Sequence, residues 1–232
     1  MADYDAVYYE NNDQAGDRPA LAFYHRLFRQ QMHGADSSKT VLEYGCGVGH
    51  LTKRLCNDFQ CYALDISDYA LSQVNTHAPT AKTIKTMDEI KKGSLDGIIG
   101  LHVLEHIKHP QDTLAEFYEK LKPGGLLVYV VPNPDGYGHR IKKDKWFGFS
   151  DKTHISLFGE KRWVELTKQA GFVIQKVRGD GMWDVPYLPA LPVFLQKLIF
   201  FPPAALQLTT GQAFLPTIFG ECLIVIARKP SR

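Results

Sequence analysis

Short apolar runs alternate with longer amphipathic stretches along most of the chain. An apolar run between turn residues predicts a buried strand, whereas apolar residues spaced three and four apart predict a helix. Alternating strands and helices predict an α/β fold, a parallel sheet with helices on both faces. Strands are predicted at 40–44, 61–65, 83–84, 95–101, 126–131, 172–177 and 222–227. Helices are predicted at 19–32, 49–57, from 68 onward, 111–121 and 160–170.

A glycine-rich loop follows the first predicted strand. Gly45, Gly47 and Gly49 allow a sharp turn and a close backbone approach to a ligand. The spacing is G-x-G-x-G, one residue tighter than the dinucleotide fingerprint. Because Glu43 precedes this loop, we expect a ligand that carries positive charge instead of a pyrophosphate. The alternative is a purely structural turn between strand and helix.

Carboxylates also follow the second and third strands, at the edge of the sheet where ligands of such folds bind. Asp65 ends the second strand, and its carboxylate can accept hydrogen bonds from ribose hydroxyls. Met87 and Asp88 follow the third strand, where methionine could cover adenine and aspartate could accept its amino proton. An ordinary solvated loop residue is an equal alternative for Asp88.

Together these residues resemble the class I S-adenosylmethionine-dependent methyltransferases. The resemblance is carried by 41–49, Asp65, 96–106 and 121–125, and it spans about residues 39–180. Residues 221–229 resemble the closing strand of that family. The Leu-Glu-His sequence at 104–106 is similar to the branch that contains the ubiquinone-biosynthesis O-methyltransferases.

The resemblance implies a Rossmann-like sheet of seven strands, mostly parallel with an antiparallel last strand, and S-adenosylmethionine as the cofactor. Glu43 and the glycine loop would hold its methionine part, Asp65 the ribose, and Met87 with Asp88 the adenine. Backbone near Gly100 and Leu101 would face the ammonium group. The whole expected cofactor site comprises Glu43, Gly45, Cys46, Gly47, Gly49, Asp65, Ile66, Met87, Asp88, Gly100, Leu101 and His102.

The Leu-Glu-His branch also raises the question of a metal. Some of its members place a metal on an acidic residue at the first motif position together with the Glu-His pair. Here that first position is His102, so we expect no metal. Glu105 and His106 are expected to cap the following helix, while His102 contacts the cofactor or the acceptor.

A second histidine is the first choice for a general base. His154 lies in a segment, 149–158, that resembles a recurring Asp-x-Thr-His stretch of the family. Histidine suits proton removal from a hydroxyl because its reference pKa is close to neutral. The alternative is that His154 only ties down its loop. The remaining histidines are expected to be structural or exposed: His25, His33, His50, His77, His109 and His139.

Three further segments bear on the substrate. Residues 139–149 combine clustered lysine and arginine with aromatic residues, which suits an anionic or planar acceptor; a solvated loop anchored by its aromatics is the alternative. Residues 182–220 hold two charges, Asp184 and Lys197, and six of the 13 prolines. That insertion is expected to form a lid, a subunit interface or a patch on a membrane surface. Tyr4, Tyr8 and Tyr9 resemble a flexible cofactor cover.

Composition narrows the function further. The 232 residues carry a formal net charge of +2, which argues against broad nucleic-acid binding. The four cysteines form no C-x-x-C pair, and reduced cytoplasmic thiols are expected. No secretory leader and no membrane span are expected. One domain is expected, divided into an N-terminal cover and helix, a cofactor core, an apolar insertion or lid, and a last strand with tail, at 1–38, 39–181, 182–220 and 221–232.

The sequence thus predicts a methyltransferase for a small-molecule acceptor, most simply at oxygen, as a monomer or homodimer. A lipid-linked, quinone-like or anionic glycan-type acceptor fits the apolar insertion beside a basic loop. The rival hypotheses are a nucleic-acid or protein methyltransferase and a scaffold subunit that binds the cofactor without catalysis. A nicotinamide enzyme is disfavoured by the glycine spacing.

Overall fold

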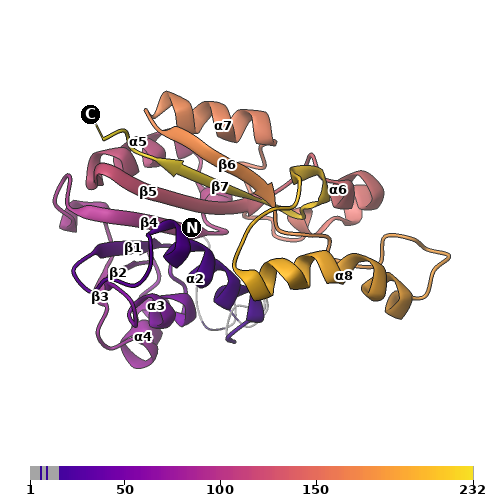
Figure 1. The fold of residues 1–232 in the computed structure, drawn as a ribbon, viewed down its shortest axis with the longest axis horizontal. Coiled ribbons are helices and arrows are strands. Elements are labelled where there is room, and N and C mark those ends of the chain that lie inside the picture. Colours follow the sequence, from indigo (N-terminus) through magenta and orange to yellow (C-terminus); the bar gives the residue numbers. More distant parts are fainter. Residues whose placement is uncertain (1–5, 7–8, 10–15, 232) are drawn as a thin grey trace.

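A seven-stranded sheet runs through the part of the chain that the computed structural model describes, residues 6, 9 and 16–231. Its strand order is β3-β2-β1-β4-β5-β7-β6. Figure 1 shows the sheet twisting between two layers of helices. The strands are β1 Thr40–Tyr44, β2 Gln60–Leu64, β3 Lys82–Ile84, β4 Leu95–Leu101, β5 Leu121–Pro132, β6 Val173–Gly179 and β7 Cys222–Arg228.

Strand directions follow the predicted pattern. β1 pairs in parallel with β2 and with β4, and β4 pairs in parallel with β5. β7 lies between β5 and β6 and is antiparallel to both. The predicted Rossmann-like sheet with an antiparallel last strand is therefore confirmed. Because these strands are parallel, the carboxyl ends of β1, β2 and β4 lie at one edge of the sheet. The motif residues come directly after these strands, at the same edge.

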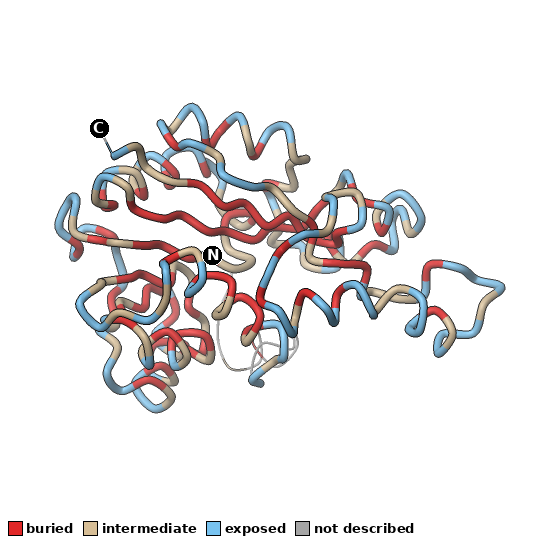
Figure 2. The backbone as a smooth tube through the Cα atoms, viewed as in Figure 1, coloured by how far each residue is buried: buried red, intermediate tan, exposed pale blue. Residues whose placement is uncertain are grey.

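The helices cover both faces of the sheet because neighbouring strand residues point to opposite sides. Leu42 and Ile98 pack in the core layer that contains Phe117 of α5 and Trp163 of α7. Their neighbours along the strands, such as Val41, pack on the opposite layer with α2 and α3. Figure 2 shows the central strands almost continuously buried. The helices are α2 Pro19–Gln31, α3 His50–Leu55, α4 Asp68–His77, α5 Pro110–Lys120, α6 Tyr137–Lys142, α7 Glu160–Gln169 and α8 Val193–Thr210.

The apolar insertion contains one long helix, α8, followed by a short 3-10 turn, Thr217–Phe219. Its C-terminal end is fixed to α2, where Arg26 donates to the Leu208 carbonyl and Gln30 Nε2 donates to the Thr210 carbonyl at 2.9 Å. Among the described residues, no helix is long and apolar enough to cross a membrane. The division of the chain at 181 and 221 stays a prediction.

Candidate active site

The glycine loop between β1 and α3 has the backbone conformation that its composition predicts. Gly45, Gly47 and Gly49 have φ values of +71°, +51° and +87°. The Gly45 and Cys46 amides donate to the Leu64 carbonyl at 2.8 and 2.9 Å, which joins the loop to the end of β2. A Cβ added at Gly49 would lie 2.8 Å from Cγ2 of Val74. Larger residues are therefore excluded at this turn by both conformation and space.

Glu43 lies beneath this loop, buried on β1. Thr52 of α3 donates its hydroxyl proton to Oε2 of Glu43. Burial raises the pKa of Glu43 to about 8, because a charged carboxylate is poorly solvated there. The side chain is thus largely neutral at pH 7 and becomes charged readily beside a cationic ligand.

Asp65 connects the end of β2 to the glycine loop. Its Oδ2 accepts from the Gly47 amide at 2.9 Å, and its Oδ1 accepts from the Ser67 amide at 2.9 Å. The Tyr9 hydroxyl approaches the same Oδ1 at 3.5 Å. Burial raises the pKa of Asp65, and the two amide hydrogen bonds oppose that shift. Tyr9 is buried over this site; Tyr4 and Tyr8 lie outside the described residues.

Two cavities meet at this edge of the sheet. A larger one of about 360 Å³ extends from Glu43 and the glycine loop toward His154. A smaller one of about 180 Å³ is lined by Tyr9, Asp65 and Ile66. The residues that line both are Gly45, Gly47, Leu101, His102 and His106. The two cavities are therefore neighbours, with the Asp65 carboxylate on the side of the smaller one and His154 on the side of the larger one.

Not every predicted cofactor residue reaches these cavities. Met87 is buried in the core layer of α5, and Asp88 is exposed on the 3-10 turn Met87–Glu89. Gly100 is buried within β4 without lining either cavity, with Tyr44 and Tyr129 opposite it on the neighbouring strands. A cofactor role for these three residues stays a prediction.

The larger cavity also contains residues of the three segments that the sequence links to the acceptor, together with Arg18 and His50, which the sequence did not single out for it. Arg18, His50, Phe147, Ser150, Asp151 and Trp183 line it. Phe147 and Trp183 come from segments far apart in sequence, and their ring centroids lie 5.1 Å apart. The clustering of aromatic residues in 139–149 was the signal for Phe147. The alternative for 139–149, a solvated segment anchored by its aromatic residues, is confirmed in part. Arg140, Lys143 and Lys145 are exposed, and Trp146 is fully buried.

His102 occupies the junction of the two cavities at the end of β4. Its φ of +53° lies in the left-handed region, which non-glycine residues adopt rarely. The backbone is held there by a 2.9 Å hydrogen bond from the His102 amide to the Val130 carbonyl. Nδ1 of His102 lies 3.4 Å from Oε1 of Glu105. Its Nε2 lies 4.0 Å from Sγ of Cys222, so the ring sits between Glu105 and Cys222 where both cavities touch it.

Glu105 is fully buried, and neither of its carboxylate oxygens has a hydrogen-bond partner. It lies with His106 on the 3-10 turn Leu104–His106. The expected capping role is wrong, because His109 is the N-cap residue of α5 and no side chain caps that helix. The Glu105 carbonyl instead accepts from the Ile155 and Ser156 amides, both at 2.9 Å. These bonds bring the loop of His154 against the turn.

The two histidines beside Glu105 have defined outer partners. Nδ1 of His154 lies 2.6 Å from the Gly148 carbonyl, so this nitrogen carries the proton. Nδ1 of His106 lies 2.8 Å from the Thr153 hydroxyl oxygen, and that hydroxyl donates to Oδ1 of Asp151 at 2.5 Å. His106 Nδ1 is therefore also a donor, and both Nε2 atoms keep a lone pair. Burial lowers the pKa of His106, which favours its neutral form.

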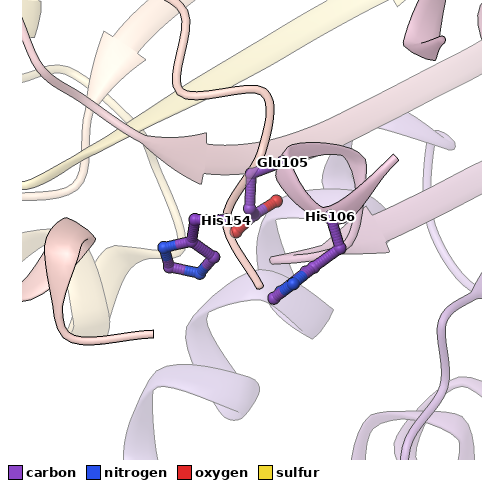
Figure 3. Close-up of side chains that lie close together, drawn as sticks. All are labelled: Glu105, His106 and His154. Atoms are coloured by element: carbon purple, nitrogen blue, oxygen red, sulfur yellow. The ribbon is translucent and has the colours of Figure 1, made fainter. Parts of the chain in front are cut away.

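Glu105, His106 and His154 form a compact cluster. One ligand atom from each lies within 4.8 Å of the others, a spacing at which they could hold one cation. Figure 3 shows the side chains converging from two segments of the chain. This set differs from the one weighed in the sequence, since His154 takes the place of His102. The expectation of no metal stays a prediction.

Comparisons with known proteins agree with this geometry. A family model described as a methyltransferase domain matches residues 13–177. The malonyl-[acyl-carrier protein] O-methyltransferase of Paenibacillus sp. is 22% identical over 164 residues, covering 63% of this chain and 59% of that protein. The ubiquinone biosynthesis O-methyltransferase of Nitrosococcus oceani is 30% identical over 117 residues, covering 47% of this chain and 50% of the relative. The chain thus spans about half the length of these curated relatives.

Solved structures share the fold at low identity. A SAM-dependent methyltransferase from Archaeoglobus fulgidus is 16% identical with a TM-score of 0.66, covering 97% of this chain and 100% of the other. A Haloferax volcanii complex of the Trm112 methyltransferase activator and a putative methyltransferase matches with 19% identity and a TM-score of 0.67, covering 99% and 97%. With its glycine loop, its antiparallel last strand and a family match over most of its length, the chain belongs to the methyltransferase domain family, class I enzymes whose cofactor is S-adenosylmethionine.

Proposed function

We propose that this chain transfers a methyl group from S-adenosylmethionine to a hydroxyl oxygen of a small-molecule acceptor. The observation that carries the proposal is the pair of neighbouring cavities, with Asp65 at one end and the histidine cluster at the other. Neighbouring cavities can place a donor and an acceptor side by side, and a displacement at carbon requires that the two reacting groups are aligned.

The residues of the smaller end fit the cofactor. Asp65 is fixed by two amide hydrogen bonds and still faces the cavity. Gly47 leaves room beside Tyr9, since an added Cβ would touch only the Tyr9 ring, at 3.5 Å. Glu43 supplies a buried carboxyl for the positively charged part. When bound, the cofactor supplies an activated methyl group on a sulfonium; the protein binds, orients and excludes water.

The residues of the larger end suit a hydroxyl acceptor with an apolar or planar body. Nε2 of His154 accepts the hydroxyl proton, because its Nδ1 is already committed as a donor to Gly148. The nearby Glu105 carboxylate stabilises the resulting imidazolium. Phe147 and Trp183 form an aromatic wall, and Arg18 offers a cation to an anionic substituent. Among the expected acceptors, a quinone-like phenol matches this lining, and one relative is named for ubiquinone biosynthesis.

Two measurements test the proposal. Calorimetric titration compares S-adenosylhomocysteine with NADH, and Asp65→Ala should weaken only the former. Transfer of radiolabelled methyl to a panel of phenolic acceptors then compares His154→Ala with His139→Ala. His139 is a matched control, because its Nδ1 also lies 2.6 Å from a backbone carbonyl, that of Pro134, yet it lines neither cavity. Preferential NADH binding, or equal transfer rates in both variants, would contradict the proposal.

A second candidate mechanism is favoured by the buried Glu105 carboxylate, whose oxygens accept no hydrogen bond. Two imidazole nitrogens and one carboxylate oxygen are a donor set that Zn²⁺ and other borderline divalent ions accept. Such an ion would lower the pKa of a bound hydroxyl, and His154 would act as a ligand instead of a base. Activity that is lost on chelation and restored by one divalent ion would select this mechanism; activity unaffected by chelation would select the proton transfer.

The non-catalytic scaffold receives no support from the site. An orientation of His102 and His154 away from the cavities would favour that hypothesis, and both line the larger one. The Haloferax neighbour is described as a complex with an activator, so a partner-dependent activity is the alternative if the isolated chain binds the cofactor but transfers no methyl group.

A further inference from the structure

Helix α8 is oriented opposite to an ordinary surface helix. A helix on a water-soluble protein buries its apolar side chains and exposes its polar ones. The fully or nearly buried residues of α8 are Gln196, Ala204 and Gln207. Its large apolar residues are exposed, with Leu198 at 68%, Phe194 at 64% and Ile199 at 55%. We call the exposed set Leu188, Val193, Phe194, Leu198, Ile199 and Leu206 the α8 face.

The two buried glutamines fix this orientation. Oε1 of Gln196 accepts from the Tyr187 and Leu188 amides at 2.6 and 3.0 Å, and its Nε2 donates to the Leu188 and Leu191 carbonyls at 2.8 and 2.6 Å. Every hydrogen-bonding position of that amide is used. These bonds hold the start of α8 against the chain just before it, and the Tyr187 hydroxyl donates to Oε1 of Glu221, the residue before β7, which ties this end of the helix to the sheet.

Gln207 anchors the other half of the helix in the same way. Its Nε2 donates to the Gly179 and Asp180 carbonyls, both at 3.1 Å. Its Oε1 accepts from the Phe214 and Leu215 amides at 2.7 and 2.9 Å. The α8 face is therefore an outward-facing surface maintained by specific polar contacts at both ends.

The charges around the α8 face are positive. Lys197 is the single charged residue between 185 and 220; it is exposed, and its Nζ lies 6.0 Å from the centroid of the Phe201 ring. Nζ of Lys142, the last residue of α6, lies 2.6 Å from Oδ2 of Asp184, which precedes α8 in the apolar insertion. The same stretch of α6 and the turn after it exposes Arg140, Lys143 and Lys145 against one exposed acid, Asp144.

The shape of the segment agrees with a surface contact. Figure 1 shows the N-terminal half of α8 and the chain before it reaching beyond the sheet, on the side where α6 lies. Figure 2 shows this projecting part largely exposed or half-buried.

We propose that the α8 face lies on a lipid bilayer with anionic headgroups, with α8 in the plane of the surface. A bilayer accepts the apolar side chains and supplies negative charge to Lys197 and to the cations of α6. A second copy of this chain matches less well, because residues 185–220 contain no acidic residue to meet Lys197. The helix would lie on the membrane; the described residues include none that could span it.

This surface adjoins the proposed site. Trp183 precedes the projecting segment and lines the larger cavity, where it contacts Phe147. If the proposed methyl transfer holds, on which this step alone rests, the acceptor enters from the bilayer and is a lipid-soluble hydroxyl compound. Membrane binding itself does not depend on that activity.

The test is sedimentation with vesicles of phosphatidylcholine alone and of phosphatidylcholine mixed equally with phosphatidylglycerol. The wild-type protein should bind the mixed vesicles more tightly. Phe194→Asp or Leu198→Asp should weaken binding by roughly tenfold to hundredfold, since a large apolar contact is replaced by a charge. Lys197→Gln should weaken binding to the mixed vesicles by about fivefold, as one lysine near an anionic surface contributes.

Val173→Asp is the matched control. Val173 is an apolar residue of β6 with 51% exposure, away from α8, and the substitution changes the net charge equally. Circular dichroism and S-adenosylhomocysteine titration verify that each variant is folded. Absence of vesicle binding by the wild-type protein would overturn the proposal, as would equal binding of Phe194→Asp and Val173→Asp. A wild-type dimer in light scattering that Phe194→Asp converts to a monomer would assign the face to a second copy instead.

Discussion

Binding of the cofactor product should release a proton from Glu43. With a pKa of about 8, this carboxyl is about nine-tenths protonated at pH 7. A nearby positive charge lowers the pKa of a carboxyl by roughly one to three pH units. Titrating S-adenosylhomocysteine into the protein at pH 7 should therefore release between about 0.4 and 0.9 proton for each molecule bound.

The assay is calorimetry in buffers with different enthalpies of ionisation, where the slope of apparent enthalpy against buffer enthalpy counts the protons. Glu43→Gln is the control, because glutamine keeps an oxygen that accepts from Thr52 but has no proton to lose. The slope should disappear in this variant. For the wild-type protein it should fall below about 0.1 at pH 9, where Glu43 is already ionised in the free protein.

The same carboxyl links folding to pH. Its folded pKa is raised above the usual 4.5, so its contribution to stability is greatest below pH 4.5 and is lost as the pH rises toward 8. The full change is on the order of 5 kcal/mol, at about 1.4 kcal/mol per pH unit. Urea unfolding at pH 5.5 and 7.5 should show about half of this change, on the order of 2.5 kcal/mol, in the wild-type protein relative to Glu43→Gln. Parallel pH profiles of the two proteins, together with no proton release, would refute the assignment of Glu43.

Three further predictions concern the rest of the site. Gly49→Ala should lower the free energy of unfolding by about 1–3 kcal/mol in urea titrations, because φ is +87° and Val74 blocks the new Cβ; an unchanged midpoint would contradict this reading of the loop. Asp65→Ala should weaken binding of S-adenosylhomocysteine by roughly tenfold to hundredfold in calorimetry, since charge-assisted hydrogen bonds are lost; Asp112→Ala is the control, because Asp112 is an exposed carboxylate of α5 that lines neither cavity. Glu105→Gln should abolish any stabilisation by Zn²⁺ in thermal unfolding, because the cluster loses its carboxylate ligand; equal stabilisation of both proteins by Zn²⁺ would show that the ion binds elsewhere.

The sheet could be predicted because each strand has its own local pattern. Runs such as 95–101 and 222–227 fall within β4 and β7, and Gly45, Gly47 and Gly49 mark the turn by composition alone. The antiparallel direction of β7 came from the family resemblance, and the order of the strands was not predicted. Nothing in the apolar pattern of 222–227 distinguishes a parallel from an antiparallel neighbour.

The acceptor side was less predictable because it forms from loops that meet only in the fold. Phe147 and Trp183 are in contact in the fold, but nothing in the sequence indicates that their two segments meet. The interpretation of Glu105 as a cap failed because Glu105 lies on a separate 3-10 turn, Leu104–His106. That turn ends before His109, the N-cap residue of α5. The orientation of α8 was equally hidden: a stretch apolar on all sides gives no preferred face, and two glutamines decide it.

The loop of His154 is attached to the backbone carbonyl of Glu105, through the amides of Ile155 and Ser156, and not to the carboxylate. The backbone of residue 105 therefore places the loop, and its side chain is left to determine the chemistry. The side chain there can change from acid to amide or alcohol while the register of the neighbouring loop persists. A single substitution at position 105 therefore changes the polar group offered to His102, His106 and His154 without removing the bonds that place the loop of His154.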